Sequence, residues 1–172
     1  MEIRTLERSD EATFRAMEAL LLAEKEAGNH LIETSLVKDF ERHCQKLKRQ
    51  ETEMADPNWS TVTTYFAFLD GEMVGKVSCR WELDKGDLAT VGGHIGYVTS
   101  PKFRRRGVMK EMLDFAFDRY RERGITRIFI TALEENVPSR RTIESVGGVL
   151  QDIIEVEDGN QLARYWVEIG EE

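Results

Sequence analysis

The chain has 172 residues, of which 41% are hydrophobic and 33% charged, and its formal net charge is −8. This size and composition are ordinary for one soluble domain with a sizeable core, which we expect to span residues 1–172. The acidic balance argues against nucleic acid as a partner, and no apolar run is long enough to cross a membrane. Residues 1–5 do not begin a signal peptide, so we expect a cytoplasmic protein.

The first third of the chain predicts one short strand and two helices. Residues 3–6 read as the strand, and a helix then begins near Ser9 and Asp10 and ends at Gly28. A second amphipathic helix is predicted from about Ser35. The two cysteines, Cys44 and Cys79, show no metal-binding spacing, so we expect no metal site.

The middle of the chain predicts a hairpin. Residues 61–69 and 73–81 have strand composition, and the Asp70-Gly71 dipeptide between them favours a tight turn. A loop that begins at Lys85 leads from the hairpin to the next strand, which contains residues 94–98.

The segment 92–113, GGHIGYVTSPKFRRRGVMKEML, runs from this strand through an arginine-rich turn into a helix. A helix N-terminus offers unpaired N–H groups and a partial positive charge. Three consecutive arginines followed by Gly107, which lets a ligand approach the backbone closely, make such a turn suitable for a phosphate or pyrophosphate.

A strand at 128–133, a helix after Asn136 that ends at Gly147-Gly148, and a hairpin over 149–169 complete the predicted order. The turn Arg104-x-x-Gly107-x-Met109 resembles motif A of the GCN5-related N-acetyltransferase (GNAT) superfamily, although Met109 replaces the usual small residue. The segment from Asn136 to Gly148 is similar to motif B of that superfamily. Within it, the chain looks most like a bacterial branch of predicted acetyltransferases.

The resemblance implies an α/β (α+β) GNAT fold. Its central mixed, mostly antiparallel sheet would have about seven strands, flanked by about four helices and splayed between strands 4 and 5. It also implies an acetyl-CoA-dependent N-acetyltransferase that acts on a primary amine of a small molecule or peptide. A homodimer is left open.

The same resemblance implies which residues bind acetyl-CoA. The backbone of Val98, Thr99 and Ser100 would pair with the pantetheine arm, and the helix start would hold the pyrophosphate. The residues of that start are Arg104, Arg105, Arg106, Gly107, Val108 and Met109. Asn136 and Ser139 would lie near the cofactor, but each is equally compatible with a role in closing or capping the helix.

Many GNAT enzymes place a tyrosine acid seven residues after the motif B asparagine, and this chain has Ile143 there. Tyr97 and Tyr165 are candidate substitutes if the fold brings them close, and water is another source of the proton. His94 is a candidate general base, with structural packing as an equal alternative, and Glu82 is the second candidate.

Two further questions stay open. Arg80 either binds a substrate carboxylate or pairs with Glu82 or Asp84. The missing tyrosine leaves a non-catalytic acyl-CoA-binding regulatory domain as the alternative function. No motif identifies the acceptor, which we expect to be set by the loops within 28–60 and 84–91.

Overall fold

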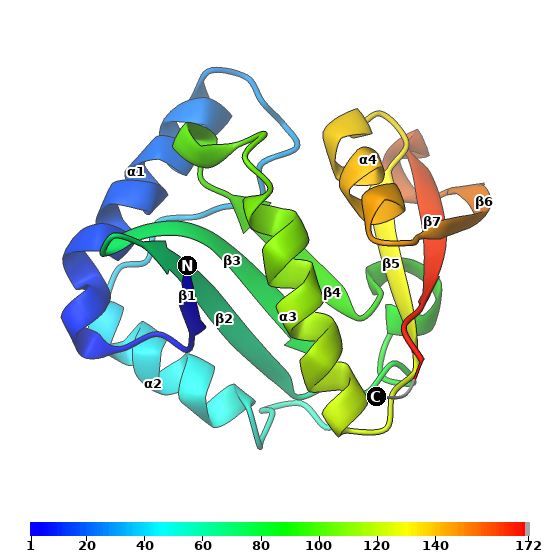
Figure 1. The fold of residues 1–172 in the computed structure, drawn as a ribbon, viewed down its shortest axis with the longest axis horizontal. Coiled ribbons are helices and arrows are strands. Elements are labelled where there is room, and N and C mark those ends of the chain that lie inside the picture. Colours follow the sequence, from blue (N-terminus) through cyan, green and yellow to red (C-terminus); the bar gives the residue numbers. More distant parts are fainter. Residues whose placement is uncertain (171–172) are drawn as a thin grey trace.

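Strands and helices follow one another in the order that the sequence predicts. The computed structural model describes residues 1–170 (Figure 1). The elements are β1 (Glu2–Arg4), α1 (Glu11–Glu26), α2 (Phe40–Gln50), β2 (Val62–Leu69), β3 (Glu72–Arg80), β4 (Ile95–Thr99), α3 (Val108–Glu122), β5 (Arg127–Leu133), α4 (Val137–Ser145), β6 (Val149–Glu155) and β7 (Gln161–Glu168). Seven strands and four longer helices confirm the predicted α/β architecture.

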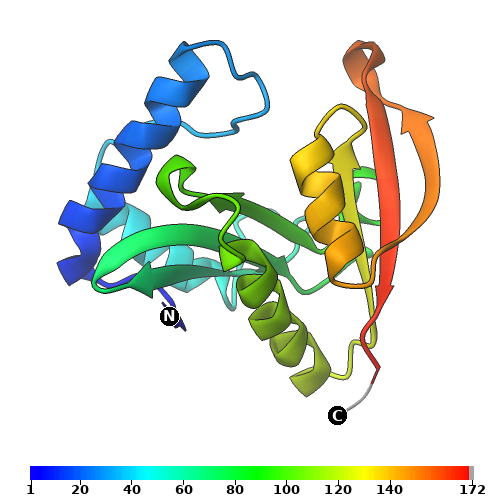
Figure 2. The same cartoon turned by 45° about the horizontal axis from the view of Figure 1, so that its top comes forward.

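The strands form two antiparallel sheets, with the order β1-β2-β3-β4 in one and β5-β7-β6 in the other. Figure 2 shows the two sheets diverging, with the turn before α3 lying between α1 and α4. No strand ladder joins β4 to β5 within residues 1–170. The predicted splay between the fourth and fifth strands is therefore confirmed.

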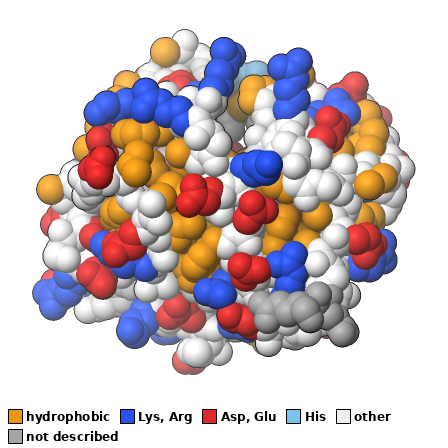
Figure 3. Space-filling model, viewed as in Figure 1, with side chains coloured by type: hydrophobic (Ala, Val, Ile, Leu, Met, Phe, Trp, Pro, Cys, Tyr) orange, Lys and Arg blue, Asp and Glu red, His pale blue; other side chains and the backbone are white. Residues whose placement is uncertain are grey.

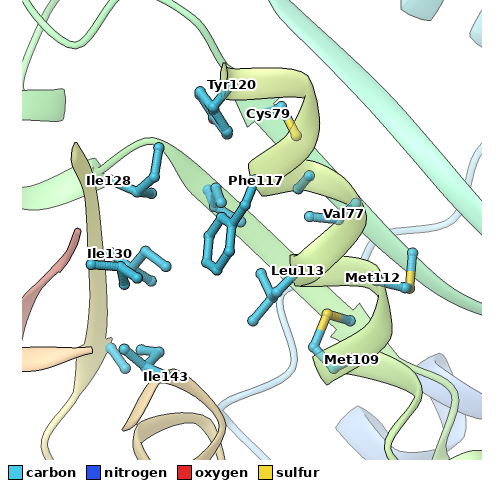
Figure 4. Packing of buried hydrophobic residues seen from close by; sticks show 14 of the residues in the cluster. Val77, Cys79, Met109, Met112, Leu113, Phe117, Tyr120, Ile128, Ile130 and Ile143 are labelled. Carbon is cyan, nitrogen blue, oxygen red and sulfur yellow. The ribbon is translucent and has the colours of Figure 1, made fainter. Parts of the chain in front are cut away.

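Two apolar clusters cover opposite faces of the four-stranded sheet. The larger one lies under α3, where Leu113 and Phe117 point toward Ile128 and Ile130 of β5 (Figure 4). The smaller one holds α1 and α2 on the other face, through residues such as Phe14, Phe40 and Phe66. Because α3 packs on both sheets, it fixes the angle at which they diverge.

Three details differ from the sequence prediction. The first strand is Glu2–Arg4 rather than 3–6. Helix α2 begins at Phe40, not near residue 35, because the Asp39 carboxylate accepts a hydrogen bond from the Arg42 amide (3.0 Å) and caps the helix there. A π-helical turn, Leu88–Gly92, precedes β4 within the predicted loop.

The hairpin turn is as predicted: Asp70 and Gly71 both have positive φ, which a tight turn between β2 and β3 requires. Among residues 1–170, no helix combines the length and the apolar character needed to cross a bilayer. The same residues contain no cluster of three or more side chains able to hold a metal ion.

Candidate active site

The turn before α3 carries backbone amides that have no hydrogen-bond acceptor within residues 1–170. Gly107 caps the helix in the left-handed conformation (φ +76°), and a Cβ added there would meet nothing within 4 Å. The amides of Val108, Met109 and Lys110 have no acceptor in the described chain. An anion that sat on this turn would therefore receive N–H groups that are otherwise unpaired.

The three arginines of this turn are not equivalent. Arg104 forms an ion pair with Glu24 of α1 (Nη1 to Oε2, 2.6 Å), and its guanidinium lowers the pKa of that carboxyl. Arg105 and Arg106 have no ion pair within residues 1–170. Figure 3 shows Lys and Arg side chains at the upper edge of this face, on both sides of a hollow.

The side chains of Val108 and Met109 point away from this turn. Both lie in the core, with exposed fractions of 7% and 6%, and Figure 4 shows Met109 beside Leu113 under the helix. Only their main-chain groups are left for a ligand. Met109 thus fills the core rather than the space in front of the helix.

The free edge of β4 continues from this turn toward the other sheet. Two hydrogen bonds fix the register with β3, from the Ser100 amide to Val74 O (2.9 Å) and from the Arg80 amide to His94 O (2.7 Å). Because antiparallel pairing alternates, the main-chain groups of Val98 also point toward β3, and those of Tyr97 and Thr99 face the gap. Of the predicted pantetheine contacts, Thr99 lies at the open edge, whereas Val98 and Ser100 belong to the ladder.

His94 lies where the two sheets meet. Its amide donates to Phe129 O (2.8 Å), and its Nδ1 accepts from the Phe129 amide (2.9 Å). The residue is 4% exposed, and burial, aided by Arg80, lowers the pKa of the imidazole to about 4. The lone pair that a general base would use is already engaged, so this geometry favours a structural role for His94.

Tyr97 and Ser139 come together across the gap. The Tyr97 hydroxyl lies 2.6 Å from Ser139 Oγ, and burial raises its pKa to about 12, so it stays protonated at neutral pH. Asn136 caps α4 by accepting from the Ser139 amide (3.3 Å). The hydroxyl pair therefore links β4 to the start of α4.

A cavity of about 390 Å³ lies on the other face of the sheet. It is bounded by α2, the loop before β2, the β2–β3 hairpin and residues 85–88. His43, Lys76 and Arg80 line it, and no motif in the sequence indicated His43 or Lys76. Burial, together with the charge of Lys76, lowers the pKa of His43, so its imidazole is neutral at pH 7.

Comparison with known proteins identifies the family of this chain. The model of the acetyltransferase (GNAT) family matches residues 25–147. The chain belongs to the GNAT family. Comparison with curated protein sequences gave no match.

Solved structures show the same GNAT fold at low sequence identity. One is the Salmonella typhimurium acetyltransferase that modifies the N-terminal serine of the 50S ribosomal subunit protein L7/L12 (TM-score 0.70, 20% identity, 98% of this chain and 94% of that chain). A second is a GNAT-family acetyltransferase from Streptococcus pneumoniae (0.69, 17%, 98% and 99%). A third is yncA, a putative acetyltransferase from Salmonella typhimurium with acetyl-CoA (0.67, 15%, 99% and 95%).

The structure also accounts for Ile143 and Glu82, two positions considered for the catalytic acid and base. Ile143, where many GNAT enzymes have a tyrosine, is fully buried in the core and contributes no acid. Glu82, the second candidate base, accepts hydrogen bonds from the Thr61 amide and hydroxyl (both 3.0 Å), which lower the pKa of its carboxyl. A lowered pKa makes this carboxylate a weaker base.

Proposed function

We propose that this protein is an acetyl-CoA-dependent N-acetyltransferase that transfers an acetyl group to a primary amine of a small molecule or peptide. The observation that carries the proposal is a junction: the open edge of β4 leads directly into the turn of unpaired amides at the start of α3. A cofactor with a peptide-like arm and a pyrophosphate fits both features at once.

The residues of this chain would divide the binding between them. The amides of Val108, Met109 and Lys110, with the guanidinium groups of Arg105 and Arg106, would hold the pyrophosphate. The main chain of Tyr97 and Thr99 would pair with the pantetheine arm as an added strand. Bound acetyl-CoA would supply an activated thioester.

The same edge offers groups for the chemical step. A β4 amide that faces the gap would polarise the thioester carbonyl, as an oxyanion hole does. The Tyr97 hydroxyl, protonated at neutral pH, is the candidate proton donor to the leaving thiolate. Neutral imidazole is available in the cavity at His43, which could accept the proton of an ammonium group.

Two of the similar structures are in keeping with the proposal. The yncA structure was solved with acetyl-CoA as its cofactor, and the ribosomal-protein acetyltransferase modifies an N-terminal serine. Both match this chain over nearly its whole length. Their substrates belong to those proteins, and for this chain the acceptor has to be found by experiment.

The test is turnover. The protein is incubated with acetyl-CoA and a panel of amines, amino acids and peptides, and release of free thiol is followed. Acceptor-dependent release above the rate without acceptor is the expected result. Tight acetyl-CoA binding without release for any acceptor would instead support the regulatory alternative, and absence of binding would contradict both.

A further inference from the structure

The walls of the cavity carry an excess of positive charge in a protein that is acidic overall. Lys76, Arg80 and Lys85 line it, against one carboxylate, Asp87. The net charge of the whole chain is −8. This local charge is thus opposite to the global balance and requires its own explanation.

Lys76 is the most unusual of these cations. It lies in the middle of β3, and within residues 1–170 its ammonium has neither an ion pair nor a hydrogen bond. The Glu18 carboxylate, whose charge acts on His43 of the same cavity, is occupied by Arg15 (2.9 Å) and by the Val37 amide (2.8 Å). Burial lowers the pKa of Lys76, which is the cost of an ammonium without a counter-ion.

Arg80 lies on the same face of β3 as Lys76, four residues farther along the strand, and its guanidinium is held by the backbone. Its Nη1 donates to Gly92 O (3.0 Å) and Gly93 O (3.2 Å), and it pairs with neither Glu82 nor Asp84. Its Nη2 lies 3.2 Å from the position that a Cβ of Gly96 would take. The guanidinium is therefore fixed in orientation on the same face of the sheet as Lys76.

The opposite wall, formed by α2 and the loop before β2, carries three apolar side chains among its polar ones. Leu47 of α2, Met54 and Trp59 line the cavity, and the Trp59 side chain is 58% exposed. A ligand that filled this space would place a charged group against β3 and an apolar group against α2 and the loop.

From this arrangement we propose that the amine acceptor carries a carboxylate group, which binds Lys76 and Arg80, and an apolar body, which packs against Leu47, Met54 and Trp59. An unpaired ammonium and an oriented guanidinium on one strand face of the cavity suit a monoanion that lies between them. The ligand would restore to Lys76 the counter-charge that the protein does not provide.

The place of the cavity fits an acceptor site, and this step rests on the proposed function. Lys76 and Ser78 are the direct ladder partners of Val98 and Gly96 on β4. Neighbouring strands are about 4.8 Å apart, so the cationic wall lies one strand from the edge at which the thioester would bind.

The experiment measures carboxylate binding by calorimetry, with coenzyme A present and absent, and so does not depend on turnover. The matched ligands are N-acetylphenylalanine and its neutral counterpart N-(2-phenylethyl)acetamide. For the unaltered protein we expect the acid to bind at least ~10-fold more tightly, the effect of one charge-assisted hydrogen bond. Lys76→Met, which keeps a chain of similar length and leaves Arg80 in place, should clearly reduce the preference.

Lys48→Met is the control, because Lys48 is exposed on α2 and does not line the cavity. It should keep the preference for the acid, and thermal melting verifies that both variants fold. N-acetylphenylalanylglycine has its carboxylate farther from the acetylated nitrogen. Comparing its affinity with that of N-acetylphenylalanine distinguishes a peptide acceptor from a free amino acid.

Equal binding of the two ligands, no binding of the acid, or an undiminished preference in Lys76→Met would overturn the inference. These outcomes are separate from failure of the proposed function. If the unaltered protein did not bind coenzyme A, the acetyltransferase proposal would be contradicted. The carboxylate preference could still be measured in the absence of coenzyme A.

Discussion

The imidazole of His94 accepts a hydrogen bond from the Phe129 amide at 2.9 Å, directly beside the backbone hydrogen bond from the His94 amide to Phe129 O. The His94 side chain thus accepts a hydrogen bond that a backbone carbonyl would accept in a regular strand pair. The two sheets are thereby joined at one end and are free to diverge at the other. The gap in which a cofactor would lie begins beyond these two hydrogen bonds.

This relationship predicts a pH dependence of stability. The imidazole pKa falls from 6.5 in the unfolded chain to about 4 in the fold, so its contribution is complete above pH 6.5 and is lost as the pH falls toward 4. The full loss is on the order of 3 kcal/mol. Denaturant unfolding measured between pH 4 and 7 should show this decline.

Two variants separate titration from hydrogen bonding at His94. In His94→Asn, a side-chain oxygen can still accept from the Phe129 amide, so we expect a stable protein without the decline between pH 6.5 and 4. In His94→Leu, the buried amide loses its acceptor, at a cost of about 1–3 kcal/mol at neutral pH. If both variants lost equal stability at pH 7, the hydrogen bond would have no special weight.

Gly107→Glu should weaken coenzyme A binding by about 2 kcal/mol, because it places a carboxylate beside the unpaired amides of α3. Gly124→Glu is the matched control. Gly124 follows the other end of α3 with nearly the same φ (+75° against +76°), and a Cβ there also meets nothing within 4 Å. Calorimetry should show a loss of affinity only in Gly107→Glu, and comparable losses in both variants would place the cofactor elsewhere.

Met109→Ala should lower stability by about 2–5 kcal/mol and leave coenzyme A affinity within about threefold, because the side chain lies in the core. Denaturant unfolding and calorimetry on the same preparation measure the two effects. A clear gain in affinity with unchanged melting would show that Met109 instead crowds the pyrophosphate.

Once an acceptor is known, the pH profile of the rate at saturating acetyl-CoA should distinguish the candidate bases. We expect the rate to rise with pH through an apparent pKa below 6.5, because His43 lines the cavity and its pKa is lowered. His43→Gln should flatten that rise, and His94→Asn should keep it. A profile that loses its acid limb only in the His94 variant would return the role of base to His94.

Local chemistry was sufficient to predict much of this fold. The Asp70-Gly71 turn and the start of a helix after Gly107 each follow from the conformational preferences of a few adjacent residues. These features were sufficient to predict the order of the elements and the turn before α3. The splayed sheet was predicted from the motif resemblance. The predicted start of α2 was wrong because a single capping residue, Asp39, sets where this helix begins.

The sequence by itself thus determined the elements and the turn suited to an anion, because both depend on neighbours in the chain. Only the tertiary structure decided which groups surround three of the side chains. His94 is hydrogen-bonded to Phe129, and Lys76 and Arg80 line the cavity. Along β3, the alternation of Lys76, Ser78 and Arg80 reads as a strand face exposed to solvent, yet α2 and the loop before β2 enclose it. Charge buried by a distant segment leaves no local pattern, since its cost and its partner are set by packing between residues far apart in sequence.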